Sequence, residues 1–119
     1  MHESVAQKLI IKLQPPLSSE KLADAVSDFI AKVADDLNLK GIIPGHIKVL
    51  IAENDVYAAF SCTKPGKIIK QTSASWDLAA LHEPSFSYNI VIFGIPKEKV
   101  INTVKLHLGQ LNLGALSSA

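Results

Sequence analysis

The side chains with the most varied chemistry fall on alternate positions of three segments that have the pattern of β-strands. Lysines, hydroxyls and one histidine alternate there with apolar residues, as on a sheet with two dissimilar faces. The residues that share the polar side are Lys8, Lys12, His46, Lys48, Tyr57, Ser61 and Thr63. With Ile10, Leu50 and Ala59 between them, these groups predict either a site for a small anionic ligand or a half-buried subunit contact. We favour the subunit contact, while a solvated face stays open because lysine stems lie over apolar surface with their charge in water.

A small enzyme with its active site at a subunit interface is the alternative interpretation. His46 or His82 would then be the acid–base and a lysine would stabilise an anion. The acidic residues offer less, because those of the first predicted helix mostly lie away from its apolar stripe and are typical of a solvated face.

The sequence contains no recognisable motif for binding a metal or a cofactor. The four histidines are scattered at positions 2, 46, 82 and 107, without a short ligand spacing, so we expect no metal site. Gly66-Lys67 is followed by Ile68 rather than serine or threonine, which excludes a P-loop, and no glycine-rich dinucleotide motif is present. We therefore expect no cofactor. His107, near the end of a predicted helix, is expected to face solvent.

Cys62 is the only cysteine, so the sequence excludes an internal disulfide and favours a reducing, cytoplasmic location. Its position opposite Ile47 in a predicted hairpin indicates a small buried hydrophobe rather than a nucleophile. Trp76, the only tryptophan, is interpreted as a core anchor, with a pocket-lining role beside Ser73, Ser75 and His82 as the alternative.

Charge and hydropathy limit the classes of partner. All twelve basic residues are lysines and the net charge is +1, so a sequence-specific nucleic-acid reader is not expected without the bidentate fork of arginine. The longest apolar run, residues 90–95, is too short to span a membrane. Hydrophobic residues make up 48% of the chain, a high share that predicts burial against a partner, and hence a homodimer or larger assembly.

The first half of the chain has the clearer pattern. Residues 5–13 alternate as a strand, and a helix follows from Ser18 or Ser19 to about Gly41. The apolar stripe of that helix comprises Leu22, Val26, Phe29, Val33 and Leu37. Residues 46–52 and 57–63 predict a hairpin around Asn54-Asp55, with Ile47 opposite Cys62 and Val49 opposite Phe60.

The second half ends in a strand and a helix. Residues 68–76 have the composition of a polar edge strand, although a loop is the alternative, and 77–82 fit a helical turn. Residues 86–95 are interpreted as a central strand that is apolar on both faces. Pro96 then begins a second helix, which Gly109 or Gly114 ends. Its expected stripe comprises Val100 or Ile101, Val104, Leu108 and Leu111.

These elements predict a single α+β domain over residues 1–119. The order strand, helix, strand, strand, a further strand or loop, strand, helix fits an open-faced sandwich, in which two helices cover one face of a mainly antiparallel sheet of four to five strands. It is a variant of the ferredoxin-like plan, which hosts many functions. The leading functional hypothesis is a small non-catalytic binding or regulatory domain that self-associates.

Overall fold

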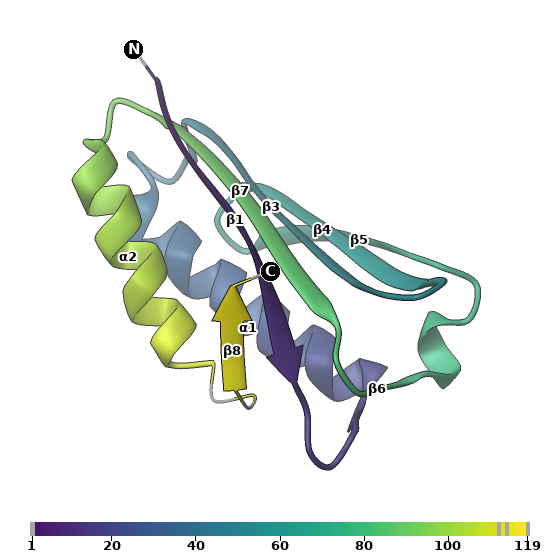
Figure 1. Ribbon diagram of the computed structural model, residues 1–119. Helices are drawn as coiled ribbons and strands as arrows, with labels where there is room; N and C mark the ends of the chain where they lie inside the picture. The colour runs from purple at the N-terminus through teal and green to yellow at the C-terminus, as the bar shows by residue number, and fades with distance from the viewer. Residues whose placement is uncertain (1, 112, 114, 119) are drawn as a thin grey trace.

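The strands assemble into one antiparallel sheet in the order β5-β4-β3-β7-β1-β8 (Figure 1). The computed structural model describes residues 2–111, 113 and 115–118. Its strands are β1 (His2–Lys12), β3 (Gly45–Glu53), β4 (Val56–Lys64), β5 (Lys67–Thr72), β7 (Ser85–Phe93) and β8 (Ala115–Ser118). A separate two-stranded sheet pairs β2 (Leu17–Ser18) with β6 (Ala80–Leu81).

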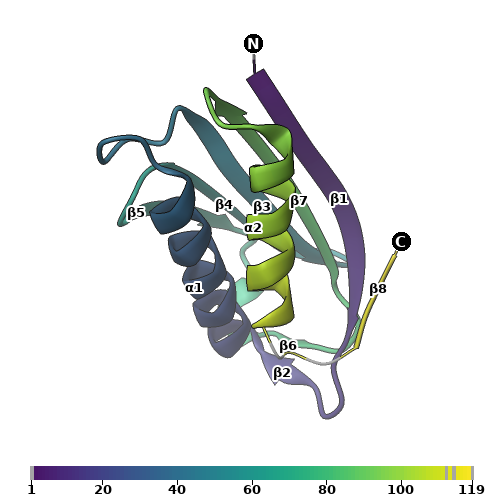
Figure 2. The same ribbon diagram turned by 90° about the vertical axis from the view of Figure 1, so that its left-hand side faces the viewer.

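Two helices, α1 (Ser19–Leu37) and α2 (Lys97–Gly109), lie side by side over one face of the main sheet (Figure 2). α1 connects β1 to β3, which are both antiparallel to β7 and flank it. α2 connects β7 to β8, which both flank β1. The α+β class, the antiparallel sheet and the two helices are thus as predicted. β8 adds a strand that the sequence pattern did not indicate.

The hairpin of β3 and β4 has the predicted register. Ile47 pairs with Cys62, and the ladder continues to Glu53 opposite Val56. The turn between them consists of two residues, and Asn54 has a φ of 54°, a left-handed conformation that asparagine tolerates better than most residues. This register decides which side chains face the helices and which face away.

For residues 68–76 the sequence leaves an edge strand or a loop open, and for 77–82 it predicts a helical turn. β5 is an edge strand that pairs with β4, as one alternative proposed. Beyond it, a short 3-10 turn spans Trp76–Leu78, whereas Ala80–Leu81, inside the helical turn expected at 77–82, form the strand β6. Trp76 is only 1% exposed, which confirms the prediction that it anchors the core.

Local signals explain the ends of α1. The hydroxyl of Ser18 accepts a hydrogen bond from the backbone N–H of Lys21, as an N-cap does. The helix ends at Leu37, before the predicted stop at Gly41, because the Asn38 side chain caps it. Asn38 Nδ2 donates to the Asp35 carbonyl, and its Oδ1 accepts from the N–H of Gly41.

The core lies between the helices and the sheet. All five predicted apolar positions of α1 are buried, and β3, β4 and β7 contribute alternate residues to the same layer. Phe29 of α1 meets Phe86 of β7 edge to face, with 5.6 Å between ring centroids. No helix in the described part of the chain is long and apolar enough to cross a membrane.

The prediction for α2 was correct for Val100 and Val104 and wrong for His107. His107 is only 8% exposed, although it was expected to face solvent. It lies seven residues, about two helical turns, after Val100, so it falls on the buried stripe. Its Nε2 lies 2.6 Å from Asp36 Oδ2 on α1, and its Nδ1 lies 2.9 Å from Gln110 Oε1. These two hydrogen-bond partners let an imidazole occupy the helix–helix contact.

Candidate binding groove on the open sheet face

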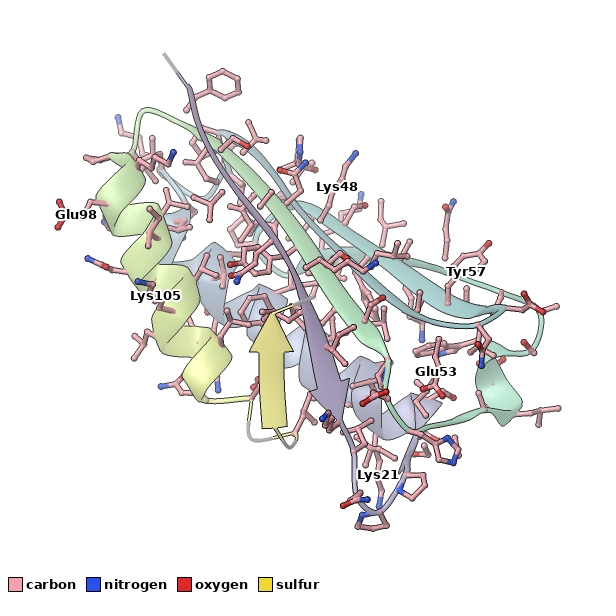
Figure 3. The ribbon with its side chains drawn as sticks, viewed as in Figure 1. Lys21, Lys48, Glu53, Tyr57, Glu98 and Lys105 are labelled. Carbon is pink, nitrogen blue, oxygen red and sulfur yellow. The ribbon has the colours of Figure 1, made fainter. Side chains whose placement is uncertain are left out.

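The face of the main sheet opposite the helices, called here the open face, has no covering element among the described residues. Figure 3 shows Lys48 and Tyr57 projecting from this side, whereas Glu98 and Lys105 of α2 project from the other. Its side chains alternate along each strand with the buried core residues. The face therefore combines rigid backbone support with access to solvent.

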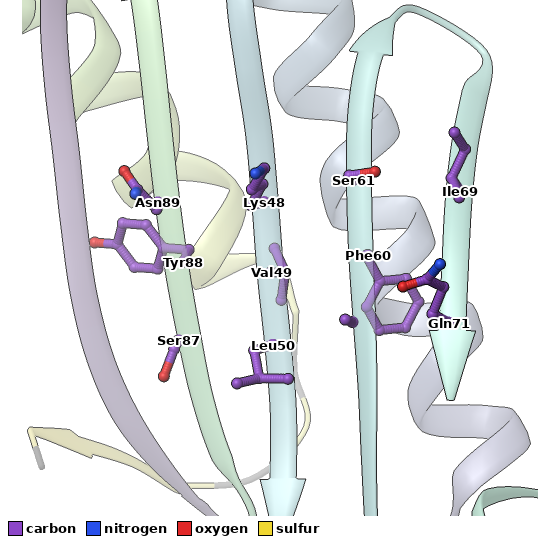
Figure 4. A pocket seen from close by; sticks show the side chains of 11 residues that line it. Lys48, Val49, Leu50, Phe60, Ser61, Ile69, Gln71, Ser87, Tyr88 and Asn89 are labelled. Carbon is purple, nitrogen blue, oxygen red and sulfur yellow. The ribbon is translucent and has the colours of Figure 1, made fainter. Parts of the chain in front are cut away.

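A groove of about 460 Å³ lies at the centre of the open face (Figure 4). Its lining comes from four adjacent strands: Lys48, Val49, Leu50, Ala59, Phe60, Ser61, Ile69, Gln71, Ser87, Tyr88 and Asn89. The volume is within the range of about 300–1,000 Å³ that small-molecule sites occupy.

The strand registers arrange the exposed lining residues in two rows across the sheet. Lys48 pairs with Asn89 on one side and Ser61 on the other, and Ser61 pairs with Ile69. The second row lies two residues away from the first on each strand and consists of Ser87, Leu50, Ala59 and Gln71. The first row thus holds an ammonium between an amide and a hydroxyl, and the second is apolar in its centre and polar at its ends.

The charged side chains that the structure describes on the open face are positive. Lys8, Lys12 and Lys48 occupy it, and none of the described residues lining the groove is acidic. Lys48 has no carboxylate within 4.0 Å among the described residues. The ion pairs found there join Lys32 to Asp28 and two histidines to acidic residues, all away from the groove. The charge of Lys48 is therefore left for a ligand or for water.

His46 is affected by this charge. It lies two residues before Lys48 on the same face of β3 and is partly buried. Burial, and to a smaller extent the positive charge of Lys48, lowers the pKa of His46 below its usual value. A neutral imidazole at neutral pH follows, so His46 adds no cation to the open face.

The predicted site residues share the open face, but only two of them line the groove. Lys48 and Ser61 lie in its first row. Lys8 pairs with Ser87 at the border, and Tyr57 pairs with Ala52 beyond the second row. His46 and Thr63 lie beyond the first row, one step past the last pair of the β3–β4 ladder, and Lys12 lies further away at the end of β1.

Sequence reasoning missed four of the eight residues that form the two rows of the groove. Ser87 and Asn89 of β7 belong to a segment that was predicted to be apolar on both faces, which is correct only for its second half. The serines and asparagine alternate with buried residues from Ser85 to Asn89, so the signal was present. Ile69 and Gln71 were placed only as part of an uncertain edge strand, because nothing local indicates which neighbours β5 has.

The histidines of the enzymatic alternative lie apart. His46 is the second residue of β3. The backbone N–H groups of His82 and Glu83 donate to Glu53 Oε1, at the far end of that strand, over 2.8 and 3.0 Å. Neither histidine lines the groove. No group of three potential metal ligands occurs among the described residues.

A second, smaller cavity of about 220 Å³ lies at the start of α1. Its lining is Ser19, Glu20, Ala23, Asp24, Lys70, Trp76 and Asp77. Trp76 thus borders a cavity, but without the Ser73, Ser75 and His82 neighbours that the sequence alternative named. Three carboxylates and one lysine give this cavity a charge opposite to that of the groove.

Cys62 is buried on the helix side of β4, as predicted. It is 1% exposed, and its thiol donates a hydrogen bond to the carbonyl of Lys64 over 3.1 Å. Burial raises the pKa of the thiol, which disfavours the nucleophilic thiolate. The thiol is also separated from the groove by the sheet itself, since it points to the opposite face.

Comparison of the chain with protein-family models, with curated proteins and with solved structures found no match. Function has to be argued from the groove itself.

Proposed function

We propose that this chain is a non-catalytic binding domain that holds a small anionic ligand in the groove of its open sheet face. The observation that carries the proposal is the central Lys48, which has no carboxylate partner and no acidic neighbour in the groove among the residues that the structure describes. A cation in a concave, partly apolar site attracts anions more strongly than one on a flat surface, because less water screens it.

Self-association through the same face is the second candidate, and exposed apolar side chains favour it. Leu50, Tyr57 and Ile69 are 41%, 44% and 55% exposed. A contact between two open faces would bring the lysines of both copies together without intervening carboxylates, and like charges at an interface are unfavourable. We therefore place the ligand first, which reverses the preference drawn from the sequence.

The fold plan that we propose is a variant of the ferredoxin-like one. In support, β1, α1, β3, β7, α2 and β8 alternate as that plan requires, and their strands lie in the order β8-β1-β7-β3. The β4–β5 part of the sheet is then an addition beside β3. The plan serves many functions and favours neither candidate.

Two variants distinguish the candidates. Under the ligand proposal, Lys48→Ala weakens the binding of a probe such as benzoate, and both Lys48→Ala and Leu50→Asp sediment like the wild-type chain. Under self-association, Leu50→Asp buries an unpaired charge and dissociates the assembly to the 12.8 kDa monomer. Lys105→Ala, on the exposed side of α2, is the control for a general effect of charge.

The measurements are an NMR titration of backbone amides and sedimentation across a dilution series. We expect benzoate to shift the amides of Lys48, Ser61 and Asn89, and neutral benzamide to shift them much less. Equal shifts from the two probes, or no shift from any anion tested, would overturn the ligand proposal.

A further inference from the structure

Resting on that proposed function, we infer that the ligand is an amphipathic monocarboxylate, whose carboxylate lies on Lys48 and whose apolar body lies over Leu50, Ala59 and Ile69. The inference follows from the number of cations, the kind of hydrogen-bond donors and the position of the apolar side chains in the groove.

The groove offers one positive charge. Within the described part of the chain, Lys48 is the only lysine in its lining. Lys8 lies on β1, which is separated from β3 by β7, and it is level with Leu50 rather than with Lys48. Strand spacing and rise therefore put its backbone about 12 Å from that of Lys48. One ammonium neutralises one negative charge, which matches a carboxylate better than a dianionic phosphate.

The donors are side chains rather than backbone groups. Phosphate sites commonly use backbone N–H groups at helix N-termini or in glycine-rich loops, or the fork of arginine. The groove lies on a sheet face, where backbone N–H groups lie in the plane of the sheet and pair between strands. Asn89 and Ser61, which flank Lys48, can each donate one hydrogen bond to a carboxylate oxygen.

The apolar part of the groove begins at Leu50 of β3. Leu50 follows Lys48 by two residues, a rise of about 7 Å along the strand. Leu50 is 41% exposed and Ile69 is 55% exposed, so both have apolar surface for a ligand to cover. A carboxylate on Lys48 thus leaves room for a ring or a short alkyl chain of about that length.

The aromatic residues of the lining do not fit single-stranded nucleic acid. Base stacking needs exposed aromatic faces. Phe60 and Tyr88 line the groove but are only 2% and 6% exposed, and their rings belong to the core side of the sheet. The groove provides an aliphatic surface, which suits an alkyl or aryl acid.

The test is a calorimetric titration of the full chain with hexanoate and benzoate, each against its neutral amide and against inorganic phosphate. We expect both acids to bind and Lys48→Met to weaken that binding about tenfold or more, the loss typical of a charge-assisted hydrogen bond. Lys48→Arg keeps the charge and should restore most of the affinity. Lys105→Met, a matched change on α2, should have no effect.

The remaining outcomes separate this inference from the proposed function. Phosphate bound with the same dependence on Lys48, with neither acid bound, would overturn the monocarboxylate and leave an anion-binding groove. Binding of a short oligonucleotide in place of the acids would overturn both the monocarboxylate and the small ligand of the proposed function. Amides bound as tightly as the acids, or no binding by any probe, would overturn both. A Leu50→Ser variant that binds hexanoate unchanged would overturn the placement of the apolar body.

Discussion

The two faces of the main sheet are made by the same strands and have opposite chemistry. On the helix side of β3, Ile47, Val49 and Ile51 are at most 2% exposed. On the open side of the same strand, Lys48 is exposed and Leu50 is 41% exposed. Successive side chains of a strand point to opposite faces, so one segment supplies both core and groove. Stability and ligand binding should therefore respond to different substitutions at neighbouring positions.

The largest expected effect lies on the helix side. Phe86→Ala removes a fully buried ring that contacts Phe29 and Tyr88 edge to face, and it should lower the free energy of unfolding by about 3–5 kcal/mol. Leu50→Ala, on the open face, should lower it by less than about 1 kcal/mol. Urea unfolding measures both. Similar losses would mean that the open face is also a packed interface.

The reactivity of Cys62 tests the same contrast through a chemical probe. Because the thiol is buried on the helix side and its pKa is raised, we expect labelling by a thiol reagent to be at least about 100-fold slower in the folded chain than in urea. A Ser61→Cys, Cys62→Ala variant places a thiol on the groove side and should react quickly when folded. Equal rates for the two folded variants would contradict the hairpin register.

A third comparison is between two histidines, His107 at the helix–helix contact and His82 near the end of β3. His107→Ala removes both hydrogen bonds of a buried ring and should lower the free energy of unfolding by about 1–3 kcal/mol. His82→Ala removes a side chain that is 66% exposed, 3.6 Å from Glu53, and should lower it by less than about 1 kcal/mol. Thermal unfolding of both variants provides the measurement. Equal, small losses would return His107 to the solvent-facing role expected from the sequence.

The alternation of apolar and polar residues along the strands predicts the buried helix side, but it identifies only part of the groove lining. The register of Ile47 with Cys62 follows from matching apolar positions around a two-residue turn, which is local information. The pairing of β3 with β7 joins residues about 40 positions apart, and no pattern in either strand specifies that neighbour. Lys48 and Ser61 could therefore be found together, whereas Asn89 and Ser87 could not be added to them.

The wrong prediction for His107 of α2 has a different cause. Val100 and Ile101 both fit an apolar stripe, and the two choices rotate the helix by about 100°. The rotation that buries Val100 also buries Thr103 and His107, and it leaves Ile101 and Leu108 partly buried. Hydropathy favours the other rotation, because it does not count the hydrogen bond that Asp36 provides from α1.

The smallest expected effect lies within the open face, between His46 and Lys48. Lys48→Met should raise the pKa of His46, because the positive charge of Lys48 is one of the two causes that lower it. The pKa should stay below its usual value, because burial is the larger cause and does not change. An NMR titration of the imidazole proton measures the shift, with Lys105→Met as a control that leaves it unchanged.

The lowered pKa of His46 also makes the free energy of unfolding depend on pH. The unfolded chain binds a proton at His46 more readily than the folded chain does, so this residue destabilises the fold as the pH falls below about 6.5. Lys48→Met should reduce that acid-induced loss, because it brings the folded pKa closer to the unfolded one. A carboxylate bound at Lys48 should act in the same direction by neutralising the charge. If Lys48→Met lowered the pKa of His46 or left it unchanged, the charge of Lys48 would not act on His46, and the expected gain in stability at low pH would not occur.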